Sequence, residues 1–169
     1  MWARSLVERC AARWLVAALL SFVAACEAAL EPEPATTLEI GTGTWRFEPV
    51  ADGGEVPLVY GAQGGWHLWL AIRVRGVAAD SASLEVVHYP LASPHEPVRV
   101  AHGVHLEPEN PEGFRAYLGW PAILERPACS VGHRYRLEVT LRPATGGRLS
   151  AVREVVVGAG DHPPPACEP

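Results

Sequence analysis

The sequence contains no lysine: all fourteen basic residues among its 169 residues are arginine. This absence excludes a lysine Schiff base and a phosphate-loop lysine, two common ways of holding a carbonyl substrate or a nucleotide. Beyond the N-terminal segment, aspartate is limited to Asp52, Asp80 and Asp161, no G-x-S-x-G motif occurs, and no carboxylate pair is spaced for acid–base catalysis. We therefore do not expect an enzyme.

Long apolar runs are also missing. The most apolar stretch, residues 15–25, has only eleven residues, too few for a helix to cross a hydrocarbon core about 30 Å thick. It follows a basic segment in which Arg4, Arg9 and Arg13 outnumber Glu8. A short apolar run after a basic segment is typical of a signal peptide.

The end of this run carries a more specific pattern, in which Val23, Ala24 and Ala25 precede Cys26. The pattern resembles the bacterial lipobox. The resemblance implies cleavage before Cys26, attachment of diacylglycerol to its sulfur, and acylation of the new N-terminus by chains such as palmitate. Ordinary secretory cleavage, with an incidental cysteine, is the alternative. An anchor of two or more acyl chains holds a protein stably to a membrane.

Residues 1–25 are thus a predicted signal peptide, and the acidic, proline-containing residues 26–36 a predicted tether. The signal peptide takes three of the fourteen arginines and one of the nineteen acidic residues, so the remaining chain has a net charge of −7. This charge argues against binding nucleic acid or anionic lipid headgroups. We expect a bacterial cell-envelope protein on the periplasmic side or the cell surface, with the membrane as its partner through Cys26.

Residues 37–160 show the period of two that is typical of strands. Tyr135, Leu137, Val139 and Leu141, for example, alternate with polar residues. Seven to eight short strands separated by turn signals predict an all-β domain, an antiparallel β-sandwich. The final hairpin, about residues 132–157, resembles the last hairpin of immunoglobulin-like and fibronectin-like domains, although the antibody Cys-Trp-Cys set is absent. The resemblance implies a fold class and no particular function.

The cysteines predict one disulfide. Cys10 is removed with the signal peptide and Cys26 is used for lipid, so Cys129 and Cys167, the latter in the proline-rich tail 161–169, remain as a pair in an oxidising compartment. The chain should return along the last hairpin to the neighbourhood of Cys129, which brings Cys167 within reach.

A copper site is the alternative use of Cys129. The sequence "CSVGH", ending at His133, somewhat resembles the ligand loop of blue-copper proteins, which also need a second imidazole, for which His67 is the candidate, and usually an axial methionine. Met1, the one methionine, leaves with the signal peptide. We therefore expect no metal and no cofactor.

Residues 59–75, "VYGAQGGWHLWLAIRVR", contain the candidate recognition patch. The glycine-rich loop predicts a hairpin, with Trp66 first on the buried face. Gln63 at the loop tip, and His67 and Trp69 on the opposite face, form the patch. An aromatic residue on a polar sheet face is either covered by a loop or available to a partner.

These observations favour a lipid-anchored, non-catalytic binding or structural module of the cell envelope. Two alternatives remain open. One is a periplasmic copper-binding domain that uses Cys129 and His133. The other is an accessory subunit of an envelope assembly, with an envelope protein of unknown identity as its partner.

Overall fold

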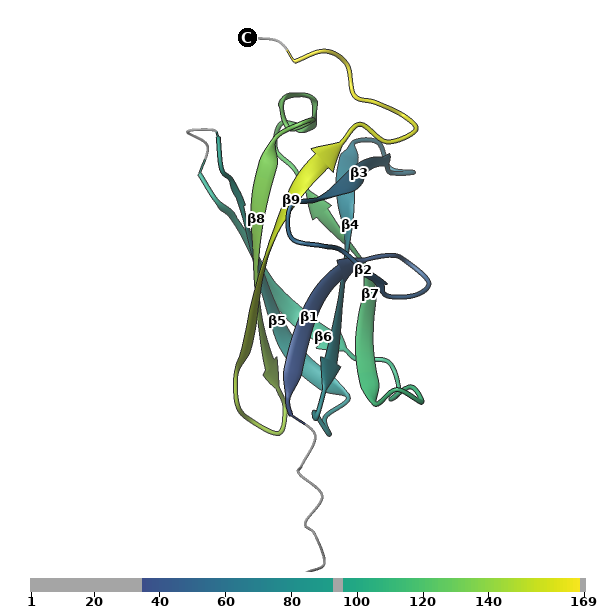
Figure 1. Cartoon of the computed structure of the whole chain (residues 1–169), viewed down its shortest axis with the longest axis vertical. Helices are drawn as coiled ribbons and strands as arrows, with labels where there is room; N and C mark the ends of the chain where they lie inside the picture. The colour runs from purple at the N-terminus through teal and green to yellow at the C-terminus, as the bar shows by residue number, and fades with distance from the viewer. Residues whose placement is uncertain (1–34, 93–95, 168–169) are drawn as a thin grey trace, which may run out of the picture. The chain divides into compact units, whose positions relative to one another are not determined.

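The computed structural model describes residues 35–92 and 96–167 (Figure 1). These residues form β1 (Thr37–Thr42), β2 (Glu48–Pro49), β3 (Gly54–Tyr60), β4 (Trp66–Arg75), β5 (Ser81–Pro90), β6 (Val98–His105), β7 (Phe114–Ile123), the 3-10 turn η1 (Pro127–Cys129), β8 (Arg134–Pro143) and β9 (Leu149–Gly158). The all-β prediction is confirmed. The predicted signal peptide, Cys26 and most of the tether lie outside the described residues. In the described part of the chain, no helix is long and apolar enough to cross a membrane.

The predicted alternation decides which side chains form the core. In β8, Tyr135, Leu137, Val139 and Leu141 are all buried, as the period of two requires. The inward faces of the other long strands complete one apolar cluster, which includes Ile40, Val56, Leu58, Leu68, Leu70, Ile72, Val74, Leu84, Val86, Val104, Leu106, Val155 and Val157. Burial of this cluster is the main force that stabilises the domain.

The strands form one curled, mixed sheet in the order β2–β1–β4–β3–β9–β8–β5–β6, and β7 pairs with β4 as well. Among the described strands, every pairing is antiparallel except that of β3 with β9, which is parallel from Gly54 to Pro57. The expectation of a wholly antiparallel arrangement is therefore wrong at this junction. The described residues form nine strands because the two-residue β2 adds to the eight longer strands.

β3 changes its pairing partner halfway along its length. Its first half pairs with β9, and its second half, Leu58–Tyr60, pairs antiparallel with β4. Pro57 stands at the change of partner, and it has no N–H with which to continue a hydrogen-bonded ladder. One short strand can therefore connect the β9 and β4 parts of the sheet.

The two ends of the described chain lie at opposite ends of the strands (Figure 1). β1 begins at Thr37 beside Arg75, the last residue of β4. After β9, the chain turns at Gly160, where φ is +69° and a Cβ would collide with the Leu58 carbonyl. This turn directs the C-terminal residues towards η1.

Candidate functional site

The predicted patch lies on the β3–β4 hairpin. This hairpin has the expected glycine-rich turn, in which Gly64 and Gly65 adopt positive φ. Gln63 is exposed at the turn, Trp69 is half-buried, and His67 is buried at 8% exposure. The rings of His67 and Trp69 meet edge to face with centroids 4.3 Å apart. The hairpin therefore presents Gln63 to solvent and packs the two rings against each other.

His67 fits closely into this hairpin. A Cβ at Gly61 would lie 3.2 Å from the imidazole Cε1, so the glycine leaves room for the ring. Burial lowers the pKa of His67, because the imidazolium would lose hydration. Its Nε2 has no hydrogen-bond partner among the described residues. His67 is thus a neutral, packed side chain near pH 7.

Trp66 connects the same hairpin to the C-terminal segment. Its ring is half-buried beside Tyr60, with centroids 4.9 Å apart, and its Nε1 donates a hydrogen bond of 2.7 Å to the His162 carbonyl. The prediction that Trp66 packs with the core holds in part, because the ring contacts the core cluster without being fully buried.

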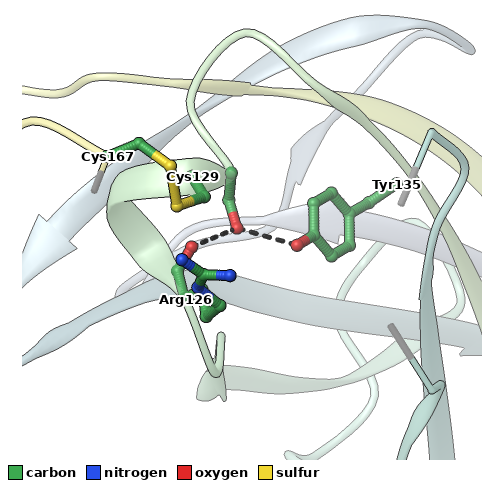
Figure 2. The surroundings of a disulfide bond; sticks show 5 residues. Arg126, Cys129, Tyr135 and Cys167 are labelled. Atoms are coloured by element: carbon green, nitrogen blue, oxygen red, sulfur yellow. Dashed lines mark hydrogen bonds between the residues drawn. A yellow bond between two sulfur atoms is a disulfide. The ribbon is translucent and has the colours of Figure 1, made fainter. Parts of the chain in front are cut away.

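The C-terminal segment is fixed a second time by the disulfide between Cys129 and Cys167 (Figure 2). The pairing predicted from the cysteine count is confirmed. Next to it, Ser130 Oγ donates to the Arg126 carbonyl at 2.8 Å and lies 2.7 Å from the Tyr135 hydroxyl. A serine has one proton to donate, so the Tyr135 hydroxyl donates to Ser130. Ser130 and Tyr135 are buried at 2% and 8% exposure, so their hydrogen bonds hold this end of the domain together away from water.

A cavity of about 220 Å³ lies beside this disulfide. It is formed where the ends of β5, β6 and β8 meet the segment after β7. Its lining residues are His88, Pro90, Ala92, Glu96, Val98, Leu124, Glu125, Arg126, Cys129, Ser130, His133, Tyr135 and Cys167. About half of these residues are polar or charged, and the others form apolar parts of the wall.

His88 is the most distinctive lining residue. It is 2% exposed, yet its Nε2 has no hydrogen-bond partner in the part of the chain that the structure describes. Burial lowers the pKa of His88, while the negative charge of Glu125 raises it to a smaller extent. The imidazole is therefore neutral near pH 7, and its Nε2 is enclosed by the surrounding protein.

The groups described around the cavity do not form a hydrolytic pair. The Ser130 proton is committed to the Arg126 carbonyl, so it is directed away from either histidine of the lining. A serine nucleophile needs a base within hydrogen-bond reach. In this structure the Ser130 hydroxyl holds η1 to the start of β8.

The disulfide occupies the cysteine that the alternative copper site would use as a ligand. Within residues 35–92 and 96–167, no group of three or more histidine, cysteine, aspartate or glutamate side chains could hold a metal ion. Cys129 is joined to Cys167 and offers no thiolate in this state, although His133 lines the same cavity. The copper alternative therefore requires the reduced cysteine pair.

A second surface lies beside β4. The Arg73 guanidinium is 4.6 Å from the ring centroid of Phe47 and 4.2 Å from that of Phe114, and Arg75 also lies 4.2 Å from Phe114. Arg73 donates two hydrogen bonds to Glu39. We call these residues, with Trp45, which is 94% exposed, the arginine–aromatic face.

Sequence reasoning did not select His88, Ser130 or Tyr135 as site residues. One signal was present: a period of two places His88 on the same face as Leu84 and Val86, so a polar residue continues a buried apolar series. The cavity itself depends on contacts between residues 88–92 and 96–98, residues 124–135 and Cys167, which are distant from one another in sequence. No family model matches the chain, and no curated protein matches it significantly.

Proposed function

We propose that the chain is a lipid-anchored protein of the bacterial cell envelope whose β domain acts as a non-catalytic binding module. The binding role is supported by one observation above all: a cavity of about 220 Å³, bordered by the disulfide, is lined by apolar, polar and charged side chains. The anchor is supported by the sequence from Val23 to Cys26 after a basic and apolar segment.

The disulfide is consistent with export. Disulfides persist in oxidising compartments such as the bacterial periplasm and the cell surface. The described chain begins near the Arg75 end of β4, whereas the cavity lies at the end of the strands that carries η1. The start of β1 and the cavity therefore lie at opposite ends of the described domain.

For the fold, we infer an immunoglobulin-like sandwich. In this arrangement β5, β6, β8 and β9 face β1, β4 and β7, and β3 contributes to both layers. Two features support it. The apolar cluster draws side chains from both groups of strands, and His102 of β6 contacts the rings of Tyr117 and Trp120 of β7 where the two groups approach each other.

Metabolic labelling tests the anchor. Expressed in a bacterium that processes lipoproteins, the protein should incorporate labelled palmitate and partition into the detergent phase of a Triton X-114 extract. Cys26→Ser should abolish both, while Cys10→Ser, the matched control, should leave both unchanged. Equal labelling of the Cys26→Ser protein would overturn the anchor.

A role as a subunit of an envelope assembly is the second candidate, and the arginine–aromatic face favours it. Tryptophan and arginine are enriched among residues that dominate protein interfaces, and Trp45 is almost fully exposed. Cross-linking in intact cells, compared between the original protein and Trp45→Ala, would test it. A partner that cross-links equally to both proteins would remove Trp45 from that interface.

A further inference from the structure

We propose that the open edge of β6 is a dimerisation surface, at which β6 of a second copy of this chain pairs antiparallel and joins the two sheets into one. The inference goes beyond the binding role proposed above and does not depend on the anchor. It rests on the backbone groups that β6 directs outward, on the side chains along this edge, and on the contrast with β7, which also pairs with a single strand of the described sheet.

The backbone of β6 has one side without a partner. β6 stands at the end of the sheet and pairs along its whole length with β5, with no shift of register. The hydrogen bond from the Leu106 N–H to the Asp80 carbonyl shows which residues bond to β5, namely residues 98, 100, 102 and 104. The N–H and C=O groups of residues 99, 101, 103 and 105 therefore point away from β5. Among the described residues, no hydrogen bond reaches this side of the strand.

The outer side of β7, by contrast, is covered by the loop that precedes it. The Asn110 N–H donates to the Phe114 carbonyl at 2.8 Å, and the Glu107 N–H donates to the Ala116 carbonyl at 2.7 Å. Proteins protect edge strands with such loops, or with proline, lysine or a bulge, because an unpaired edge invites another strand. β6 contains no proline, no lysine and no bulge. Its outer side is therefore open to pairing with another strand.

The solvent-facing side chains of β6 leave room for a second strand. Ala101 and Gly103 are small and exposed, and a Cβ placed on Gly103 would meet no atom within 4 Å. Arg99 forms an ion pair with Glu85 of β5. The charge that two copies would bring together is thus compensated within each copy, so a second β6 can approach without strong repulsion.

A second copy of β6 can satisfy every outward group of this edge. When Arg99 lies opposite His105 of the second copy, and Ala101 lies opposite its Gly103, each outward N–H meets a carbonyl and each outward carbonyl meets an N–H. The two-fold axis repeats each pair, as an interface between identical surfaces requires. A strand of the same length, with small residues at the matching positions, is available in every copy of the chain.

The same register is favourable on the core-facing side, where Val100 lies opposite Val104 of the second copy and His102 lies opposite its own counterpart. Val100 is 36% exposed although it is on this side, so the added strand would cover apolar surface. A shift by one pair in either direction loses hydrogen bonds, because Pro97 has no N–H and the Glu107 N–H already bonds within its own chain.

Disulfide trapping tests the register. His102→Cys places two thiols at the two-fold axis, where the Cα atoms of a non-hydrogen-bonded pair lie about 4.5 Å apart, within the range of a disulfide. The purified full chain, in mild detergent, is treated with a mild oxidant and run on a gel without reductant. We expect a covalent dimer from His102→Cys and none from Val152→Cys, a control at an exposed residue of β9. A folded His102→Cys protein that yields no more dimer than Val152→Cys would overturn the proposal.

A proline at the edge tests the hydrogen bonds. Ala101→Pro removes an outward N–H from each copy and leaves the ladder with β5 intact, because the Ala101 N–H does not bond to β5. By sedimentation equilibrium in density-matched detergent, the original full chain should dimerise with a Kd on the order of 10–100 µM, as suits a small interface. Ala101→Pro should raise this Kd at least about tenfold with an unchanged circular dichroism spectrum, whereas Ala101→Thr, which keeps the N–H, should not.

Two results of the sedimentation experiment would overturn the proposal. One is an original protein that stays monomeric up to about 0.5 mM, well above the expected Kd. The other is equal association of the original protein and folded Ala101→Pro, which would place the contact on another surface. The outcome is separable from that of the anchor, because Cys26 precedes the described domain and Cys26→Ser should dimerise with the same Kd. A protein that labels with palmitate but stays monomeric would keep the envelope assignment and lose the dimer.

Discussion

Two buried histidines in this domain have the same chemistry and different surroundings. His67 and His88 are 8% and 2% exposed, burial lowers the pKa of both, and neither Nε2 has a partner within the described residues. His67 packs on Trp69 within the hairpin, whereas His88 lines a cavity. The two imidazoles therefore differ in their surroundings, although the Nε2 of each is enclosed by protein.

The region around His88 depends on a covalent link that the hairpin around His67 does not contain. Reducing the Cys129–Cys167 disulfide, which joins residues 38 positions apart, should destabilise the protein by about 4 kcal/mol in the chain-entropy model. Urea unfolding of the original protein and of Cys129→Ser would measure this. Peptide mapping without reductant that finds two free thiols would contradict the prediction.

Trp66 tests how far the hairpin and the C-terminal segment depend on each other. Its ring is half-buried and bonds to the His162 carbonyl, so Trp66→Ala should cost less than the loss of a fully buried aromatic residue, about 2–3 kcal/mol. Trp66→Phe keeps most of the packing and should cost about 1 kcal/mol, the value of the hydrogen bond. Chemical unfolding of both variants checks these values. Equal losses in the two would mean that the hydrogen bond outweighs the packing.

The histidines can be compared directly through pH. A folded-state pKa below the unfolded value of about 6.5 means that the unfolded chain binds more protons in the interval between the two values. Stability should therefore fall as the pH drops below about 6.5, and the loss should end below the folded-state pKa. His67→Phe and His88→Phe should each flatten part of this dependence.

Glu125→Gln should change the pH dependence that His88 causes without changing the part that His67 causes. Glu125 raises the pKa of His88, so its removal should steepen the acid loss of stability that His88 causes. The contribution of His67 should not change. Thermal melts from about pH 7.5 to about pH 5 on the single variants, and on Glu125→Gln combined with His88→Phe, would show this. A steeper loss in Glu125→Gln that persists when His88 is absent would contradict the assignment.

The sequence predicted the regular parts of this molecule well because those parts follow local rules. The alternation in β8 predicted which side chains are buried, and the cysteine count predicted the disulfide. The parallel pairing of β3 was missed because it depends on a distant strand, β9, and on Pro57 at the change of partner.

The candidate site was less predictable. His88 continues the buried series of Leu84 and Val86, but histidine is only intermediate in its tendency to be buried, and only the meeting of β5, β6, β8 and the η1 segment creates a cavity beside it. His67 was placed on the polar face of its strand, and the close approach of Gly61 encloses it. In both cases the histidine is buried by residues from other parts of the chain. The alternation along a single strand does not predict those contacts.

The smallest effect on stability is expected at Gln63, the member of the predicted patch that is exposed. Gln63→Ala should change the free energy of unfolding by less than about 0.5 kcal/mol, because an exposed loop-tip side chain contributes little. If the patch is a recognition site, Gln63→Ala should also weaken co-purification of an envelope partner. Trp69→Ala should weaken it too, once the recovered partner is compared at equal amounts of folded protein. Gln63 is the one glutamine of the chain, so the matched control is Thr145→Ala, another polar side chain in an exposed turn, before β9. If Gln63→Ala and Thr145→Ala recover the same amount of partner, the hairpin has only a structural role. The cavity would then be the remaining candidate site.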